Sequence, residues 1–430
     1  MENIWSSWNG NIRHSYENLF FPDTENEIVK IVKNAQKLRV VGTGKSSADI
    51  AAGTSTLVSL EKYNQILSID HKSHRITVQS GILLKTLLQE MEKNGLAFPA
   101  LPDIDDITVG GAIATGTHGT GKNAQSLSEY IVALKMVNAS GEIDTIQSGD
   151  PALGAYKISL GLLGVITEIT FQCIPRKVMS ISERPMKDDL WLAAYKRMLQ
   201  ENDFLRILWL PHTGYGYVIT GNYVNENERV LEKKGPWYYS YRRAVSKFLY
   251  QKAIKKPARI VTANKILKKL FFSKEQQKFG SLYDATVTKS RGSTLELAEW
   301  TVDIDRFDTL FFQLKKELNN KTNNAFVHIP MDVRFMKAET GWLANGLGKN
   351  IVTMGCVTRN AEEANHYKAF ELVENLFLEH DGRPHWAKRF QCGRKVLNRL
   401  YPNWQNFVEL RQKRDPEGKF LNAYLEKIFI

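Results

Sequence analysis

Alternating apolar and polar positions predict strands and helices through roughly the first 175 of the 430 residues. Short runs rich in β-branched residues are typical of strands, and four of them lie at 37–44 (KLRVVGTG), 55–60 (STLVSL), 66–71 (ILSIDH) and 74–81 (HRITVQSG). Apolar residues recur at helical spacing in two further segments, 26–36 (NEIVKIVKNAQ) and 83–95 (LLKTLLQEMEKNG). Strands and helices interleaved in this way predict an α+β domain.

Strict alternation in the segment 325–335 (AFVHIPMDVRF) predicts another strand, half-buried in a second domain. One face would carry Ala325, Val327, Ile329, Met331, Val333 and Phe335, and the other Phe326, His328, Pro330, Asp332 and Arg334. Residues two apart on a strand lie roughly 6.5–7 Å apart on the same face. We therefore expect His328, Asp332 and Arg334 to form a row, which is either a substrate site or a solvated face with a charge pair.

Composition limits the class of protein. A chain of 430 residues with 43% apolar content can form two or three domains with real cores. Three cysteines without metal or redox spacing, an odd count, argue against a disulfide framework, and no metal site is predicted. No apolar window is long enough to span a bilayer. We therefore expect a soluble cytoplasmic protein, with peripheral attachment to the inner face of a membrane as the variant.

The net charge of +12 arises almost entirely from one segment. Residues 232–278 hold 14 Lys or Arg against two acids, so this stretch alone carries 14 − 2 = +12. Aromatic side chains are interleaved with these cations, a composition that suits an anionic membrane surface. A solvated basic insertion is the alternative. Nucleic acid is not expected as a partner, because no nucleic-acid-binding motif accompanies the basic run.

Two glycine-rich loops carry the clearest chemical signal. The first, Gly42-Thr43-Gly44-Lys45-Ser46-Ser47, follows a predicted strand, and the second spans 108–121 (TVGGAIATGTHGTG). Glycines let backbone N–H groups approach a pyrophosphate, and hydroxyl side chains add further donors. Neither loop has the spacing of a nucleotide-binding P-loop or of a Rossmann turn. Two such loops in one domain are difficult to explain as turns alone.

The order of three motifs resembles the flavin domain of the vanillyl-alcohol oxidase superfamily: GTGKSS (42–47), TVGGAIATGTHGTG (108–121) and SLGLLGVITEITF (159–171). The branch with alditol oxidases and aldonolactone oxidoreductases is the most similar, since WNGN (8–11), PHWAK (384–388) and DPEGKFLNAYL (415–425) also match. The resemblance implies a two-subdomain FAD-binding domain of the PCMH type at 1–175 and a cap domain with an antiparallel sheet at 176–380. The basic insertion 232–278 interrupts the cap, and a C-terminal segment 381–430 returns to the flavin.

The resemblance also implies which residues bind FAD. They lie on the two glycine loops, on the segment after the second loop, and near the C-terminus: Gly42, Thr43, Gly44, Lys45, Ser46, Ser47, Gly110, Gly111, Thr115, Gly116, Thr117, His118, Gly119, Gly161, Gly164, Val165, Ile166 and Asn422.

Lys45 departs from the family pattern. At this place many members carry a histidine bonded covalently to the flavin, while others lack it and bind FAD without that bond. The resemblance therefore implies non-covalent FAD. Lys45 itself is either a loop lysine with no role or a cation over the phosphates or the flavin edge.

The chemistry implied by the resemblance is hydride transfer from a carbinol of a sugar, polyol or aldonolactone to flavin N5. Asp332 and Arg334 match a Glu-x-Arg pair of the aldonolactone branch, with the acid one methylene shorter. Arg334 and Lys388 would favour developing negative charge, and Asp332 or His328 would orient hydroxyls or accept the proton. The alternative is oxidation of a lipid-linked sugar at a membrane surface, as by decaprenylphosphoryl-ribose oxidase, or a quinone-linked dehydrogenase. The electron acceptor is oxygen, a quinone or a protein.

Overall fold

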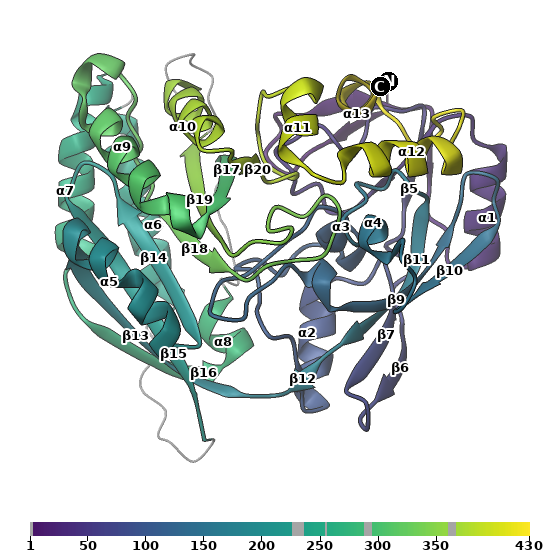
Figure 1. Ribbon diagram of the computed structural model, residues 1–430, viewed down its shortest axis with the longest axis horizontal. Helices are drawn as coiled ribbons and strands as arrows, with labels where there is room; N and C mark the ends of the chain where they lie inside the picture. Colours follow the sequence, from purple (N-terminus) through teal and green to yellow (C-terminus); the bar gives the residue numbers. More distant parts are fainter. Residues whose placement is uncertain (1–2, 226–235, 254–255, 288–294, 360–366) are drawn as a thin grey trace.

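The structure, a computed structural model, describes residues 3–225, 236–253, 256–287, 295–359 and 367–430. Two lobes lie side by side in Figure 1, one built from the N-terminal residues and the other from the middle of the chain. The C-terminal helices lie on the N-terminal lobe, and both chain ends are drawn there.

The N-terminal lobe contains the predicted α+β arrangement around two main sheets. Three strands form a parallel sheet, in the order β3 (Asn18–Phe20), β5 (Thr56–Ser59), β4 (Leu38–Val41). Five strands form an antiparallel sheet, in the order β10 (Ile143–Gln147), β9 (Ile131–Val137), β11 (Val165–Gln172), β7 (Arg75–Gln79), β6 (Ile66–Asp70). The four strands predicted from alternation are thus present as β4 to β7.

Both predicted helices of this lobe are present, as α1 (Glu25–Asn34) and α2 (Leu84–Lys93). The hydroxyl of Thr24 caps α1 by accepting the amide N–H of Glu27, which satisfies one free donor of the first turn. Ile28 and Val32 of α1 are buried against Val165 in a core shared by both sheets. Shorter elements complete the lobe: β1 (Ile4–Ser6), β2 (Arg13–Ser15), β8 (Leu96–Ala97), α3 (Val109–Ala114), η1 (Leu127–Tyr130), α4 (Leu153–Lys157) and β12 (Ile174–Pro175).

The middle of the chain, the cap lobe, is built on one eight-stranded sheet whose paired strands are all antiparallel among the residues described. Its order is β16 (Gln276–Ser281), β13 (Val178–Lys187), β15 (Tyr215–Val224), β14 (Phe204–Leu210), β18 (Met331–Met336), β19 (Ile351–Arg359), β17 (Leu295–Asp303), β20 (Arg383–Pro384). Side chains alternate across this sheet, so each strand contributes to two different environments.

Helices cover both faces of the cap sheet. On one face, Trp191 of α5 (Asp188–Glu201) and Trp209 of the sheet both lie edge-on to Phe311 of α9 (Phe307–Asn319), at ring distances of 4.6 and 4.8 Å. On the other face, Phe272 contacts Tyr217 of β15 at 5.4 Å, directly after α7 (Ile260–Phe271). The basic stretch therefore supplies α6 (Pro236–Ala253) and α7 to the face opposite α5 and α9. Further cap helices are η2 (Pro257–Arg259), α8 (Leu282–Thr286), η3 (Ile304–Arg306), η4 (Lys321–Asn323) and α10 (Tyr367–Glu379).

The last helices fix the chain end to the N-terminal lobe. They are α11 (Arg394–Leu400), α12 (Trp404–Arg414) and α13 (Ala423–Phe429). Trp404 stacks on Phe429 at 4.8 Å, and the amide of Leu38 in β4 donates to the carbonyl of Lys419 at 2.9 Å. Because β4 leads directly into the first glycine loop, the hydrogen bond between Leu38 and Lys419 helps to hold that loop in place.

The strand predicted at 325–335 is wrong in its first half, because β18 begins only at Met331. Met331 pairs with Trp209 near the end of β14, and Pro330 has no N–H to extend the ladder. His328 therefore does not join the predicted row. Its buried ring lies 5.3 Å from that of Tyr250, and its Nε2 lies 3.1 Å from the hydroxyl of Ser246.

No helix among the described residues is long and apolar enough to cross a membrane.

Candidate active site

The two glycine loops meet at a cavity of about 1120 Å³ between the lobes. A Cβ on Gly42 would lie only 2.4 Å from the hydroxyl oxygen of Thr108, so glycine at position 42 lets the first loop approach the second without displacing that side chain. Gly44 and Gly161 both have positive φ, +67° and +68°, which side chains rarely tolerate. Bare backbone is therefore exposed along this end of the cavity.

Most of the residues expected to bind FAD line this cavity: Gly42, Thr43, Gly44, Lys45, Ser46, Gly110, Gly111, Thr115, Thr117, His118, Gly161, Gly164 and Ile166. The other five are outside its lining and hold the surrounding structure. The amide of Ser47 donates to the carbonyl of Ala387 at 2.8 Å, and Val165 is buried in the core under α1. Gly116 packs against Ile158, and Gly119 against the backbone of Leu101.

Asn422, the fifth of these residues, links the C-terminal segment to the loop that follows Ser47. Its Nδ2 donates to the carbonyls of Asp49 and Ala52 at 2.9 and 2.6 Å. Its Oδ1 accepts the amide N–H of Leu425 and so caps α13. The placement gives Asn422 a supporting position behind the first glycine loop.

Arg39 provides a test of whether this end of the cavity fits a dinucleotide. Its buried guanidinium donates to the carbonyls of Phe420 and Leu160 at 2.8 Å each, and no carboxylate pairs with it among the described residues. Burial lowers the pKa of Arg39 to about 10, so it remains a cation at neutral pH. A cation that has no carboxylate partner among the described residues, beside Gly161 and just before the first glycine loop, fits an anionic pyrophosphate.

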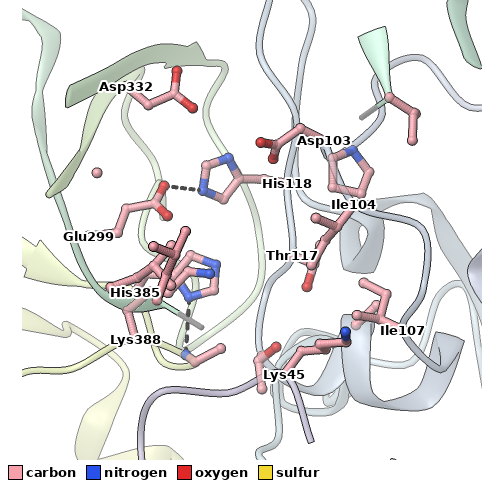
Figure 2. A pocket seen from close by; sticks show the side chains of 18 of the residues that line it. Lys45, Asp103, Ile104, Ile107, Thr117, His118, Glu299, Asp332, His385 and Lys388 are labelled. Atoms are coloured by element: carbon pink, nitrogen blue, oxygen red, sulfur yellow. Dashed lines mark hydrogen bonds and ion pairs between the residues drawn. The ribbon is translucent and has the colours of Figure 1, made fainter. Parts of the chain in front are cut away.

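Lys45, on the first glycine loop, also lines the cavity (Figure 2). Its Nζ is 2.5 Å from a carboxylate oxygen of Asp106 and 5.3 Å from the ring centre of Trp8. The lysine therefore has an acidic partner that partly offsets its charge.

Four charged side chains form the wall of the cavity at the seam between the lobes. The Nε and Nη2 of Arg206 donate to Asp332 at 2.8 and 2.6 Å, and the Nε and Nη2 of Arg334 donate to the same carboxylate at 2.8 and 2.6 Å. Asp103 of the N-terminal lobe accepts from Arg334 at 2.7 Å and from Arg206 at 3.3 Å. The two arginines face each other in the register of β14 and β18.

This arrangement determines the protonation of Asp332. Burial raises the pKa of its carboxyl, but the guanidiniums of Arg206 and Arg334 outweigh burial and hold the pKa below its ordinary value. A carboxylate that already accepts four short hydrogen bonds is a poor proton acceptor. Asp332 therefore fits the role of orienting the two arginines.

A second buried cluster adjoins the first. His118 Nε2 lies 2.9 Å from a carboxylate oxygen of Glu299, and His118 Nδ1 lies 3.0 Å from the carbonyl of Gly119 (Figure 2). The carbonyl of Gly119 takes the proton of Nδ1 as its donor. The contact between Nε2 and Glu299 therefore needs a second proton, which lies between these two groups. Burial raises the pKa of Glu299, but His118 outweighs it and holds the pKa well below the ordinary value.

His385 lies beside this pair. The donor atoms of His118, Glu299 and His385 lie within 4.8 Å of one another. His385 Nδ1 accepts the amide N–H of Ala387 at 3.1 Å, and burial lowers the pKa of the ring to about 3. The ring is therefore neutral with its proton on Nε2. Lys388 follows in the same turn and lines the cavity, and His328 is not part of the lining.

Comparison with known proteins identifies the family. The family model described as D-arabinono-1,4-lactone oxidase matches residues 169–428, and the FAD binding domain model matches 17–147. The chain belongs to the D-arabinono-1,4-lactone oxidase family. It is 28% identical over 436 residues to L-gulonolactone oxidase of Mus musculus, covering 99% of this chain and 98% of that one. It is 26% identical over 437 residues to L-gulono-1,4-lactone dehydrogenase of Mycobacterium tuberculosis, covering 100% and 99%.

Solved structures support the fold. A solvent-stable cholesterol oxidase superposes with a TM-score of 0.83 at 17% identity, covering 100% of this chain and 98% of that one. The predicted PCMH-type fold, the FAD cofactor and the class of FAD-linked oxidoreductase are thus confirmed for this member of the D-arabinono-1,4-lactone oxidase family.

Sequence reasoning missed Asp103, Arg206 and Glu299. Two of them carried a usable signal, since Arg206 is the one charged residue of the strand FLRILWL and Glu299 lies between Ala298 and Trp300 in the strand LELAEWTVD. Burying such a residue is costly unless it is paired, so each marks a site. Asp103 lies in a loop and carried no comparable signal.

The first prediction concerns how FAD is held. With lysine at position 45, we expect acid precipitation of the purified protein to release all flavin absorbance into the supernatant. Flavin retained in the pellet would mean a covalent bond through another residue.

The second prediction concerns the buried pair of His118 and Glu299. Replacing Glu299 by Gln should lower the free energy of unfolding of the holoprotein by about 2 kcal/mol at neutral pH, because it removes a charged hydrogen-bond partner. Urea denaturation measures this, with the exposed Glu409→Gln as control.

The pH dependence of that loss has a defined sign. The folded pKa of Glu299 lies below its unfolded value of about 4.3, so the stabilisation is complete above that pH and is lost as the pH falls through the folded pKa. The difference between the two proteins should therefore shrink as the pH falls below about pH 4. Equal stability of the two proteins at pH 7 would contradict this account of the pair.

Proposed function

We propose that the protein oxidises a carbinol of a sugar lactone, with FAD as hydride acceptor. The observation that carries the proposal is that Asp332, Arg334 and Lys388 share one cavity with both glycine loops. Relatives named for L-gulonolactone and D-arabinono-1,4-lactone support this substrate class. The same hydride transfer can also act on a carbinol of other sugars or of a polyol.

The protein's own residues would position the substrate and stabilise charge. FAD, when bound, supplies the acceptor for the hydride. Arg334 is held by Asp332, by Asp103 and by the carbonyl of His118, which accepts from its Nη1 at 3.4 Å. A guanidinium fixed in this way favours negative charge on the substrate oxygen without having to reorganise. Lys388 adds a further cation to the lining of the same cavity.

The geometry favours separate roles for the two residues considered as proton acceptor. Asp332, with a lowered pKa, would be a positioning residue for the two arginines. His328 is turned towards α6, where the backbone carbonyl of Ser246 also lies 3.0 Å from its Nε2. We therefore propose that His328 supports the cap and does not touch the substrate.

The third prediction tests this function directly. Mixing the holoprotein anaerobically with L-gulono-1,4-lactone or D-arabinono-1,4-lactone should bleach the flavin absorbance. The variant Arg334→Met should retain FAD but bleach about 10²- to 10³-fold more slowly, the usual loss for one preorganised donor. The surface variant Arg306→Ala should behave as the wild type, since Arg306 pairs with Asp381 outside the cavity. Unchanged absorbance with every lactone and polyol tested would contradict the function.

We infer a second candidate function, in which the same reaction acts at a membrane surface on a lipid-linked sugar or passes electrons to a quinone. The supporting observation is the outer face of α6. Trp237, Tyr241 and Phe248 are 72%, 54% and 56% exposed. Positions four and eleven residues apart fall on nearly the same side of a helix, so the three rings form one row.

The neighbouring helix extends this surface. α7 exposes Ile266 and Leu270 together with Lys265 and Lys269. The opposite sides of both helices line the cavity, through Tyr238, Arg242, Ser246, Leu267 and Phe271. Exposed aromatic rings among lysines suit the interface of an anionic bilayer. Binding there would place α6 and α7, whose inner sides line the cavity, against the lipid.

The fourth prediction tests this second candidate. In sedimentation with phosphatidylserine-containing vesicles, the triple variant of Trp237, Tyr241 and Phe248 to Ala should bind more weakly by at least about tenfold, as expected for lost apolar burial. Reversing the charge of Lys265 and Lys269 should also weaken binding, by about 1 kcal/mol for each cation removed and more on reversal. The matched control is Phe312→Ala, since Phe312 is 69% exposed on α9, on the other face of the sheet. If the triple variant binds the vesicles as tightly as the wild type does, the exposed rings of α6 do not form a membrane-binding surface.

A further inference from the structure

Arg206 has the position of a substrate-binding residue. It projects from β14 into the cavity, beside Arg334 of β18, and 17% of its side chain is exposed. The strand places Phe204 and Leu208 on the same side, so Arg206 is the charged position of an otherwise apolar row. Neither sequence reasoning nor the family comparisons single it out.

One edge of this guanidinium is fixed and another is available. Nε and Nη2 donate to Asp332, and Nη2 also donates to Asp103. Nη1 has no hydrogen-bond partner in the described part of the chain, and it is not sealed from solvent. The two carboxylates therefore hold Arg206 through Nε and Nη2 and leave the N–H donors of Nη1 to a ligand of the cavity that Arg206 lines.

The charge of the cluster indicates what those donors can accept. Arg206 and Arg334 carry two positive charges, and Asp103 and Asp332 carry two negative charges, so the four groups sum to zero. An anionic ligand at this point would be repelled by the two carboxylates. Among these four groups, no excess positive charge would offset that repulsion. A neutral oxygen, such as the carbonyl of a lactone ring or a sugar hydroxyl, accepts from Nη1 without that repulsion.

We propose that Arg206 binds the substrate through Nη1, donating to a neutral oxygen of the closed lactone, and that Asp103 is a positioning residue for both arginines. The proposal rests on the proposed lactone function. It predicts that the site distinguishes the neutral lactone from the open-chain aldonate anion, which differs from it by one hydrolysed ester bond and one negative charge.

The experiment measures binding and turnover separately on the FAD-loaded protein. Anaerobic titration calorimetry of the reduced holoprotein with L-gulono-1,4-lactone should show a dissociation constant about 10- to 100-fold higher for Arg206→Ala than for wild type, the usual effect of losing a hydrogen bond to a charged group. KM should rise by a similar factor, with a smaller change in kcat. Added guanidinium ion should partly restore Arg206→Ala and not stimulate the wild type. Sodium L-gulonate should bind the wild type more weakly than the lactone does.

Matched variants keep each outcome informative. Arg306→Ala, a surface arginine, should bind the lactone as the wild type does, and Asp103→Asn should weaken binding in the same direction as Arg206→Ala. If Arg206→Ala fails to retain FAD, Arg206→Lys decides, because it keeps the charge but loses the fork of donors. A dissociation constant within twofold of wild type in the deciding variant, or gulonate binding as tightly as the lactone, would overturn the proposal.

The design also separates this proposal from the function on which it rests. A wild-type protein that binds the lactone through Arg206 but never bleaches its flavin would refute the oxidation and leave the binding role of Arg206 intact. A wild-type protein that does not bind the lactone would overturn both.

Discussion

Asp332 lies between two guanidiniums, and this contact organises the wall of the active site. Two like charges a few ångströms apart repel by several kcal/mol at the effective dielectric of a partly buried site. Arg206 and Arg334 stay side by side because Asp332 accepts from both and Asp103 of the other lobe accepts from both as well. The cluster therefore fixes the orientation of the arginines and helps to connect the two lobes.

The remaining parts of the site depend on close approaches that only certain residues permit. Gly42 lets the first glycine loop touch Thr108 of the second, and the C-terminal segment supports the first loop through the contact of Leu38 with Lys419. The cap contributes Glu299, whose buried carboxylate is stabilised by the ring of His118 beside it. Residues from the beginning, middle and end of the chain thus converge on one cavity.

The sequence predicts the local structure well where periodicity is strong. The alternation in 37–81 gives β4 to β7, and the two glycine loops lead to the flavin fold. The strand prediction failed at 325–335 because the alternation of apolar and polar residues does not show that Pro330 interrupts the hydrogen-bond ladder. It also gave no indication that Arg206 and Asp332, 126 residues apart, would pair across neighbouring strands. Pairing of that kind depends on strand order, which follows from the packing of the whole cap.

The central claim is that the four-charge cluster and the glycine loops form one lactone-binding site. The most direct test is a crystal structure of the FAD-loaded protein, reduced and soaked anaerobically with L-gulono-1,4-lactone. The account predicts lactone oxygens within hydrogen-bond distance of Arg206 Nη1 and Arg334, with Asp332 still bridging both arginines. A lactone bound elsewhere in the cavity, or an Asp332 released from both arginines, would contradict it.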